Sequence, residues 1–536
     1  MKSSVFVMAA MAGMLMSCSH TKVIEYPTIE QRNSKSLEFY QVEMSDTALI
    51  LHGDVYNRPG NWVRMSSSSV LKGRTTGKTY RLVRAAGIEL DKQETMPESW
   101  HRSFSLQFEP VDPKDKLVDF DEALAEGNGW KIEGISLEDK KKKGMLCRIE
   151  GQVVDNPTYS RLVLVPEWTD TRSNDWISIP VRDGKFSYDL YVERPAMYEL
   201  YAWSDQMNGS WMPVSFIADE GKVEFTFQHP DKAAEWTSDI KLNQEYQRFN
   251  QDTEDKFMTP LRKEEEALEA AGKVHTPEML ELRKQFESVK TREEADAIRA
   301  KAQKLSEEGK EFTPEYLAFE EKSAKMMDEY FAYTLAYAES NPTLIGLGRL
   351  KEVTRWVERS KVFSAKDIIS IYNKVYAGKF TGDATDNSML NWILSQSLKV
   401  GDRFIDFTAP DAQGKMHMLS EEIKGKVALI DLWASWCGPC RRASMSMIPL
   451  YESYKDKGFT VVGVARERLQ KNMESAIKKD GYPWLCLLEL NDAGKIWEKY
   501  GVALGGGSIF MVDKEGKILA INPSAEEVKA ILEKML

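Results

Sequence analysis

The sequence predicts a multidomain protein with two N-terminal β-sandwich-like domains, an α-helical middle region and a C-terminal α/β domain. Three patterns support this division. Apolar and polar residues alternate between Gly, Pro and Asp turns over residues 37–230, as in Ser103 to Phe108. Apolar residues then recur at helical spacing up to about Leu394. Finally, a short apolar run from Val427 to Leu432 precedes another helical pattern, which is typical of a buried strand followed by a helix.

These changes of pattern also set the expected domain boundaries. A chain of 536 residues is long enough for three or four domains. The expected parts are an export leader at 1–17, a β-sandwich-like domain at 18–143, a second β domain of unknown function at 144–232, a helical region at 233–397 and the α/β domain at 398–536.

Helix-start signals support the helical region. Threonine stands before proline at Thr276 and Thr313, and Thr291 with Glu294 has the spacing of a capping box. The stretch 264–310 is highly charged and has few large apolar residues. We expect a solvated helical hairpin there rather than a partner-binding arm, because a charge run is usually a solvated face.

Composition excludes one class of function. The formal net charge is −11, whereas proteins that bind nucleic acid carry a basic surface. We therefore expect no nucleic-acid partner.

The N-terminus predicts export. The apolar run from Val5 to Met16 is too short to span a bilayer comfortably and fits a signal-peptide core. Residues 15–18, Leu-Met-Ser-Cys, resemble a bacterial lipobox, which implies lipidation of Cys18 and stable anchoring by several acyl chains. An ordinary secretory signal is the alternative. The expected location is the cell envelope, as a periplasm-facing lipoprotein with the outer membrane favoured over the inner.

Two cysteines follow the apolar run, and they are separated only by glycine and proline. Cys437 is expected at the N-terminus of a helix, where unpaired N–H groups and the helix dipole stabilise an anion. A thiolate is such an anion, so the pKa of Cys437 should fall. Cys440 lies one turn further along and should be the more shielded thiol. Zinc is the competing use of this spacing, but the sequence shows no second pair of ligands, because Cys147 and Cys486 are single and far apart. We expect no metal.

Residues 433–440, Trp-Ala-Ser-Trp-Cys-Gly-Pro-Cys, resemble the thioredoxin active site. The flanking segments resemble the extracytoplasmic TlpA-like branch, which is related to the AhpC/TSA group; they include 399–402, 404–410, 425–427 and 510–517. The resemblance covers about the last quarter of the chain and implies a thioredoxin fold for 398–536.

The resemblance also implies roles for particular residues. Cys437 would attack a substrate disulfide, and Cys440 would resolve the mixed disulfide, so the redox-active disulfide Cys437–Cys440 takes the place of a cofactor. Asp431 matches the buried acid of thioredoxin and would relay a proton near neutral pH, although a structural hydrogen-bonded aspartate is the alternative. Trp436 and Pro439 would shape the substrate-contact surface.

One departure from the family concerns the loop that faces the motif. The family has a cis-proline there, and the corresponding residue here is Gly507, followed by Ser508. Both are expected to contact substrate, and the alignment predicts that proline would be tolerated at 507. Glycine does not hold a cis bond, which puts the usual substrate docking in doubt.

Two functions therefore remain open. The first is an exported, membrane-anchored thiol-disulfide oxidoreductase that reduces a disulfide-containing protein substrate and receives electrons from a membrane donor. The second is a lipoprotein binding module for a protein or glycan partner, with a vestigial thioredoxin domain.

Overall fold

The computed structural model describes residues 21–122, 129–139, 143–168, 176–210, 212–228, 233–396, 398–502 and 506–536. The chain divides into two compact units, Met1–Gln247 and Arg248–Leu536, and each is described by itself. The expected leader and Cys18 lie outside the described residues. Among the residues that are described, no helix is both long and apolar enough to cross a bilayer.

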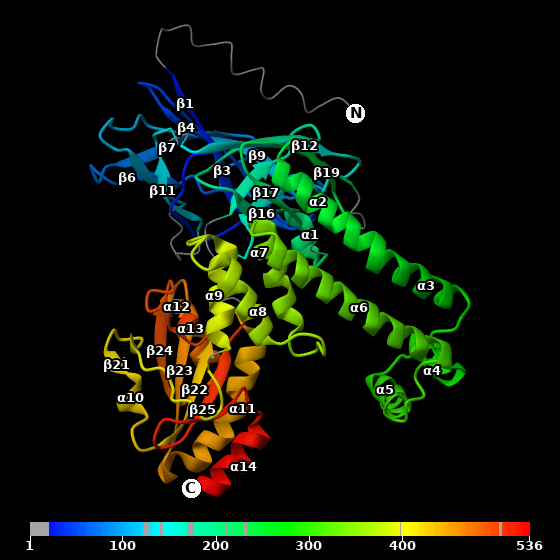
Figure 1. Ribbon diagram of the computed structural model, residues 1–536. Coiled ribbons are helices and arrows are strands. Elements are labelled where there is room, and N and C mark those ends of the chain that lie inside the picture. Colours follow the sequence, from blue (N-terminus) through cyan, green and yellow to red (C-terminus); the bar gives the residue numbers. More distant parts are fainter. Residues whose placement is uncertain are drawn as a thin grey trace. The chain divides into compact units, whose positions relative to one another are not determined.

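The first unit begins with one nine-stranded antiparallel sheet, drawn in blue and cyan in Figure 1. Its strands in spatial order are β1 (Lys22–Glu25), β3 (Leu37–Met44), β4 (Leu49–Tyr56), β9 (His101–Phe108), β7 (Thr79–Ala86), β6 (Val70–Gly73), β10 (Leu117–Asp121), β11 (Lys131–Ser136) and β2 (Gln31–Arg32). A two-stranded ribbon accompanies it, β5 (Trp62–Val63) and β8 (Glu94–Thr95). This single sheet differs from the two facing sheets that the sequence led us to expect.

The nine-stranded sheet must curl, because its two edge strands are close neighbours in sequence. Nine strands at about 4.8 Å spacing would put β1 and β2 roughly 38 Å apart in a flat sheet. The chain between them, residues 26–30, can span only about 20 Å. The curl lets one sheet enclose its own core, in which Phe39 contacts both Phe104 and Phe120 edge to face. A second sheet is therefore not needed to bury its apolar face.

The rest of the first unit is a β-sandwich, as expected. One sheet has the order β15 (Lys185–Val192), β12 (Met145–Val153), β18 (Gly221–Phe227) and β19 (Glu235–Ser238); the other has β14 (Ile177–Pro180), β13 (Arg161–Pro166), β16 (Ala196–Ala202) and β17 (Val214–Ala218). A short helix, α1 (Trp203–Asn208), follows β16. Alternate residues of these strands form one buried core between the sheets, which includes Cys147.

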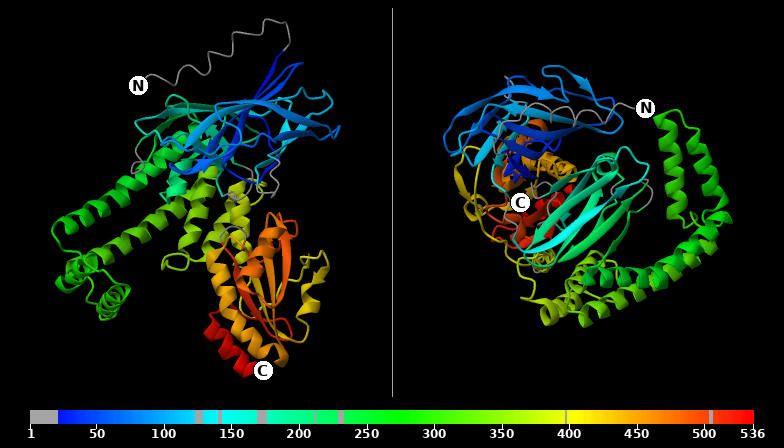
Figure 2. Two further views of the ribbon diagram at one scale, coloured as in Figure 1. Left: turned by 180° about the vertical axis from the view of Figure 1, so that it is seen from behind. Right: turned by 90° about the horizontal axis from the view of Figure 1, so that it is seen from above.

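The second unit begins with helices. Their bounds are α2 (Lys241–Thr253), which starts in the first unit, α3 (Thr259–Ala270), α4 (Pro277–Glu287), α5 (Arg292–Glu307), α6 (Pro314–Ser340), α7 (Leu344–Val353), α8 (Ala365–Ile371) and α9 (Ala384–Ser395). Four shorter turns complete the helical set: two π-turns, Glu254–Met258 and Tyr372–Tyr376, and two 3-10 turns, Thr354–Trp356 and Lys455–Lys457. Helix α6 packs on α3, and α4 and α5 lie at the far end of that pair (Figure 1 and Figure 2).

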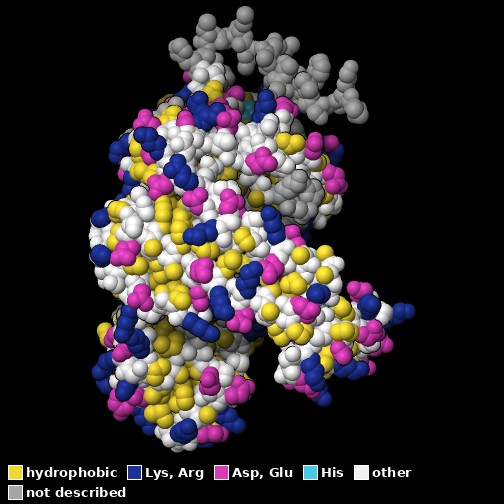
Figure 3. Space-filling view, turned by 45° about the vertical axis from the view of Figure 1, so that its right-hand side comes forward, with side chains coloured by type: hydrophobic (Ala, Val, Ile, Leu, Met, Phe, Trp, Pro, Cys, Tyr) yellow, Lys and Arg dark blue, Asp and Glu magenta, His cyan; other side chains and the backbone are white. Residues whose placement is uncertain are grey.

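The predicted helix starts are confirmed. Thr276 and Thr313 accept hydrogen bonds from the backbone N–H three residues later, and Thr291 with Glu294 forms the full capping box. The charged stretch forms the hairpin of α4 and α5. Lys and Arg side chains are interspersed with Asp and Glu on the face drawn in Figure 3.

The C-terminal domain is a five-stranded mixed sheet. Its order is β24 (Leu485–Leu490), β23 (Phe459–Glu467), β22 (Val427–Trp433), β25 (Ser508–Val512) and β26 (Ile518–Ile521). Strands β24, β23 and β22 are parallel to one another. Strand β25 runs antiparallel to β22, and β26 runs antiparallel to β25. The helices are α10 (Leu419–Glu422), α11 (Gly438–Tyr454), α12 (Gln470–Asp480), α13 (Ile496–Lys499) and α14 (Ala525–Met535), and a ribbon of β20 (Thr408–Pro410) and β21 (Met416–Met418) precedes them.

The two faces of this sheet bury separate cores. One core lies under α11, α12 and α14 and includes Trp433, Met447 and Cys486. The other includes Ile430 and Leu432 of the central strand together with Trp497 and Tyr500 at α13. All seven residues of β22 are buried. The end of this strand is therefore a rigid support for whatever follows it.

Candidate active site

The two motif cysteines follow directly from the central strand. Cys437 is the N-cap of α11 and accepts a hydrogen bond on its sulfur from the Cys440 backbone N–H, at 3.3 Å. The two cysteines form a disulfide with 5.3 Å between their Cα atoms. An N-cap residue faces the unpaired N–H groups and positive end of the helix dipole. The site therefore favours a thiolate at Cys437 once the disulfide is reduced.

We expected Cys440 to be the more shielded of the two cysteines, but Cys437 is the more buried residue. Cys437 is only 7% exposed, and Cys440 is half-buried. Burial of the whole residue thus does not identify Cys440 as the shielded cysteine, because Cys437 is packed into the core beside Leu432. Two of the predicted contact residues do lie on the surface, since Trp436 is 45% exposed and Pro439 is also exposed.

Asp431 is buried in β22, the strand that precedes the cysteines. Burial raises its pKa to about 7, and a hydrogen bond from the Ser444 hydroxyl opposes this rise. Ser444 Oγ lies 2.6 Å from Asp431 Oδ2 and 3.0 Å from the Cys440 carbonyl oxygen. The serine thus connects the acid to the helix turn that carries Cys440. A carboxyl group with a pKa near 7 can both hold and release a proton at neutral pH.

A second buried carboxylate holds the loop before Cys437. Glu467, at the end of β23, accepts the Ser435 backbone N–H at 2.6 Å and the Ser435 hydroxyl at 2.9 Å. Arg441 donates to the Ser435 carbonyl at 3.2 Å and pairs with Asp480 through two hydrogen bonds of 2.5 and 2.6 Å. Sequence reasoning missed Glu467, because its partner lies 32 residues away on another element.

Gly507 faces the disulfide from the opposite loop. Its N–H donates to Cys440 Sγ at 3.0 Å. A Cβ atom at this position would lie 1.9 Å from the Leu432 carbonyl oxygen and 3.0 Å from Cys440 Sγ. Proline would introduce that clash and remove the N–H donor, so the expectation that proline is tolerated at 507 is wrong.

Ser508 begins β25 and is buried. Its hydroxyl donates to Asn522 Oδ1 at 2.8 Å, and the same oxygen accepts the Ile509 N–H at 2.9 Å. The structure thus places Gly507 against the disulfide and links Asp431 through Ser444 to the helix turn of Cys440. The Ser508 side chain instead joins β25 to the end of β26.

The other cysteines and acids do not extend this site into a metal centre. Cys147 and Cys486 are buried free thiols, and burial raises the pKa of both. Within the described ranges, no group of three His, Cys, Asp or Glu residues is placed to hold a metal ion.

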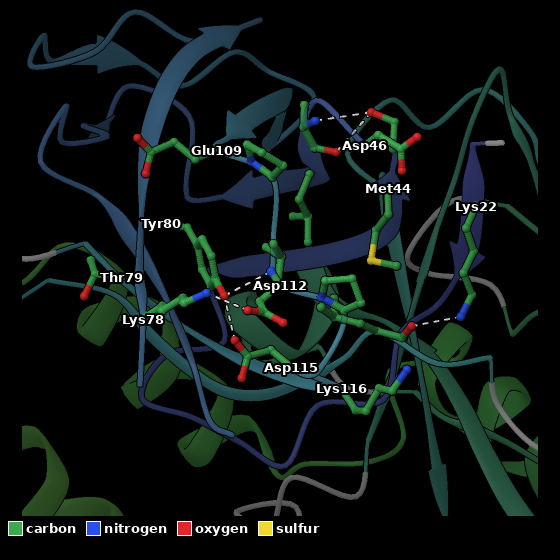
Figure 4. A pocket seen from close by; sticks show the side chains of 17 residues that line it. Lys22, Met44, Asp46, Lys78, Thr79, Tyr80, Glu109, Asp112, Asp115 and Lys116 are labelled. Atoms are coloured by element: carbon green, nitrogen blue, oxygen red, sulfur yellow. Dashed lines mark hydrogen bonds and ion pairs between the residues drawn. The ribbon is translucent and has the colours of Figure 1, made fainter. Parts of the chain in front are cut away.

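A cleft of about 930 Å³ lies on the first unit and is drawn in Figure 4. Its polar side chains are engaged with one another. Lys78 pairs with Asp112, Tyr80 donates to Asp115 at 2.6 Å, and Lys22 donates to the Leu137 carbonyl at 2.9 Å. These contacts hold the loops together, and the cleft contains no nucleophile comparable to the cysteine pair.

Comparison with known proteins agrees with this site. The family model described as Redoxin matches residues 399–536. The thiol-disulfide oxidoreductase ResA of Bacillus thuringiensis subsp. konkukian is 27% identical over 141 residues, which is 26% of this chain and 79% of that protein. ResA of Bacillus subtilis is 25% identical over 152 residues, covering 28% of this chain and 74% of that protein.

Solved structures are similar over the same part of the chain. The thioredoxin domain of a thiol-disulfide oxidoreductase from Bacteroides vulgatus is 33% identical, with 26% of this chain and 98% of that chain covered and a TM-score of 0.24. A thiol:disulfide interchange protein from Bacteroides sp. is also 33% identical, with 26% and 90% covered and a TM-score of 0.24.

The strand, the helix and the disulfide at the helix N-terminus define the class as a thioredoxin-superfamily protein. Residues 399–536 match the Redoxin family model and are similar to the TlpA-like thiol-disulfide oxidoreductases named ResA.

Proposed function

We propose that this protein is an exported, membrane-anchored reductase of protein disulfides and that Cys437 and Cys440 are its reacting pair. The observation that supports this most directly is the disulfide between them at the N-terminus of α11. The related proteins are named thiol-disulfide oxidoreductases.

The reaction balances as two thiol–disulfide exchanges. The Cys437 thiolate attacks one sulfur of the substrate disulfide and releases the other as a thiolate. Cys440 then loses its proton and attacks the Cys437 sulfur, which frees the second substrate thiol and leaves the Cys437–Cys440 disulfide. Asp431, whose pKa burial raises to about 7, is the proposed acceptor of the Cys440 proton in this step. Two electrons from a membrane donor restore the dithiol for the next cycle.

The proposed direction is reduction. The Gly-Pro dipeptide between the two cysteines is that of thioredoxin, whose potential is about −270 mV. A strongly oxidising protein at about −120 mV needs a much more stabilised thiolate. Arg441 adds little stabilisation, because its guanidinium is paired with Asp480. We expect a potential below about −200 mV. Equilibration with glutathione buffers measures it, and a potential near −120 mV would reverse the assignment to an oxidase.

The proposed location is the periplasmic side of the cell envelope, with Cys18 as the lipid-bearing residue and the outer membrane favoured over the inner. This rests on the resemblance of residues 15–18 to a lipobox. Metabolic labelling with a fatty acid tests it, and loss of label in Cys18→Ala is the expected result.

Two variants test the chemistry. Cys437→Ser should lose disulfide reduction by at least about a thousandfold, because the nucleophile is gone. Cys440→Ser should accumulate a mixed disulfide with the substrate, because resolution is blocked. Full activity of Cys437→Ser would overturn the assignment of Cys437 as the nucleophile. A wild type that reduces no disulfide would instead favour the alternative, a binding module for a protein or glycan partner with a vestigial redox domain.

A further inference from the structure

A cleft of about 450 Å³ lies beside the disulfide within the second unit. One wall comes from the helical region, through Ser388, Asn391 and Trp392 of α9. The other wall comes from the C-terminal domain, through Tyr500, Gly507 and Asn522. Its volume is in the usual range for ligand sites. The two walls come from segments that are far apart in the chain.

Two glycines that line the cleft also lie next to the sulfur atoms of the cysteine pair. Gly507 lines it and donates its N–H to Cys440 Sγ at 3.0 Å. Gly506 also lines it, and a Cβ atom built there would lie 3.9 Å from Cys437 Sγ. Neither glycine has a side chain, so a bound chain can approach their backbone closely. A group bound in the cleft is therefore next to the reacting pair.

The α9 wall contains a buried hydroxyl with no partner among the described residues. Ser388 is 4% exposed, lines the cleft, and its Oγ atom makes no hydrogen bond there. A buried polar group without a partner costs about 1–3 kcal/mol. The hydroxyl belongs to a residue that lines the cleft and is separate from the redox pair.

The remaining polar groups also suit a peptide. Asn391 provides an amide and Trp392 provides aromatic surface, and both are half-buried. Amides and hydroxyls match the N–H and C=O groups of an extended chain, which must be satisfied when it is buried. A substrate disulfide attacked by Cys437 brings its flanking residues to this place, since each residue extends the chain by only about 3.3–3.6 Å.

We propose that this cleft binds the polypeptide segment next to the attacked cysteine of the substrate, and that α9 is its specificity wall. The inference rests on the proposed disulfide reduction and adds a specificity-determining surface to it. Helix α9 ends at Ser395, before the Redoxin match begins at residue 399. Substrate selection is thus assigned to a part of the chain outside the redox domain.

The test uses the reduced full-length chain under single-turnover conditions. One probe is a synthetic peptide with an internal disulfide and four residues on either side, and the other is the small disulfide 5,5′-dithiobis(2-nitrobenzoate). Asn391→Trp fills the cleft from a half-exposed position. We expect the ratio of the rate constants, peptide over small disulfide, to fall at least tenfold. Leu390→Trp is the matched control, because Leu390 is the preceding residue of α9, is exposed and is not among the cleft-lining residues.

A second pair of variants tests the Ser388 hydroxyl. Ser388→Ala should lower the peptide rate constant about fivefold, through the loss of one hydrogen bond. Thr385→Val removes an equally buried, unpartnered hydroxyl from the same helix but outside the cleft lining, and should leave the ratio unchanged.

The outcomes separate the two proposals. If the wild type reduces neither probe, the proposed reductase function fails, and this inference fails with it. If the wild type reduces the peptide while Asn391→Trp and Ser388→Ala keep the wild-type ratio, only the assignment of the cleft is overturned. An equal loss on both probes also overturns it, because the variants would then act on the disulfide rather than on peptide binding.

Discussion

Buried charges are treated in opposite ways in the two units. In the first unit a group of charged side chains lies between the curled sheet and the sandwich. Glu38 pairs with Arg32, Asp54 pairs with Arg182 at 2.5 Å, and the Arg161 guanidinium lies 4.0 Å from the Tyr56 ring centroid. In the C-terminal domain, Asp431 is buried with a serine hydroxyl as its recorded hydrogen-bond partner.

The difference corresponds to two uses of a buried charge. A paired charge keeps one protonation state and fixes the geometry of its neighbours. A buried carboxyl group beside a hydroxyl has no cation to hold it ionised, so its pKa rises towards neutrality. The first arrangement suits a permanent interface between two β domains. The second suits a group that has to gain and lose a proton during each cycle.

The largest expected change in the free energy of unfolding comes from removing Arg161, at the centre of the buried charged group of the first unit. Arg161 is fully buried, packs on Tyr56 and on Trp203, and donates to the Lys35 carbonyl at 2.9 Å. Arg161→Ala should destabilise the first unit by about 3–5 kcal/mol, because it leaves a cavity beside Tyr56 and Trp203 and removes the donor to the Lys35 carbonyl. Urea denaturation measures this loss.

The control for that variant is an exposed arginine of the same unit. Arg148 on β12 pairs with Asp189 at 3.0 Å at the surface. Arg148→Ala should cost less than about 1 kcal/mol. Equal losses for the two arginines would mean that burial does not distinguish them.

The second prediction concerns Asp431, the buried carboxyl group of the C-terminal domain. The folded pKa of Asp431, about 7, exceeds the value of about 3.9 in an unfolded chain. The folded state therefore binds more protons between those values, and its stability falls as the pH rises from about 4 to about 7. At pH 8 the penalty is at most about 4 kcal/mol.

Asp431→Asn should remove that penalty. The variant should be more stable than the wild type at pH 8 and lose most of this advantage near pH 4, while its disulfide reduction near neutral pH becomes slower. Hydrogen exchange of the β22 amides reports the local stability. An advantage that does not change with pH would contradict the raised pKa.

Local sequence signals predicted the parts of the fold that depend on neighbouring residues. The threonine caps at 276, 291 and 313 act within one helical turn, and the motif at Cys437 needs only a strand followed by a helix. Asp431 was identified through the resemblance to thioredoxin, and the residue is buried as that resemblance implies.

Distant pairings were not predictable in the same way. The alternation of β2 and β11 does not show that Arg32 pairs with Ile132, and this pairing is what makes the first sheet one curled sheet. Glu467 and Ser388 carry no local motif either, since each gains its significance from a segment of the chain that the fold brings beside it. The clash at Gly507 also depends on the carbonyl of Leu432, on another strand.

The third prediction concerns Glu467, whose carboxyl group is buried and held by neighbouring hydrogen-bond donors. Glu467 is buried like Asp431, but it accepts two hydrogen bonds from Ser435. Glu467→Gln keeps the size and weakens these bonds, so the unfolding free energy should fall by about 1–2 kcal/mol. Because the loop before Cys437 loosens, peptide reduction should slow by roughly tenfold. Gln470→Ala is a control on the neighbouring helix α12 and should leave the rate unchanged.

The smallest expected effect comes from the partner of Asp431. The Ser444 hydroxyl hydrogen bond lowers the pKa of Asp431 against the effect of burial. Ser444→Ala removes it, so the pKa should rise further, and the pH midpoint of the reduction rate should move upward by roughly one unit. Ser446→Ala is the matched control, because Ser446 lies on the same helix and donates to the Ala443 carbonyl at the surface. Stopped-flow rates from pH 5 to 9 measure both variants. An unchanged midpoint in Ser444→Ala would mean that the rate does not depend on the protonation of Asp431, and the acid would then be structural, like the paired charges of the first unit.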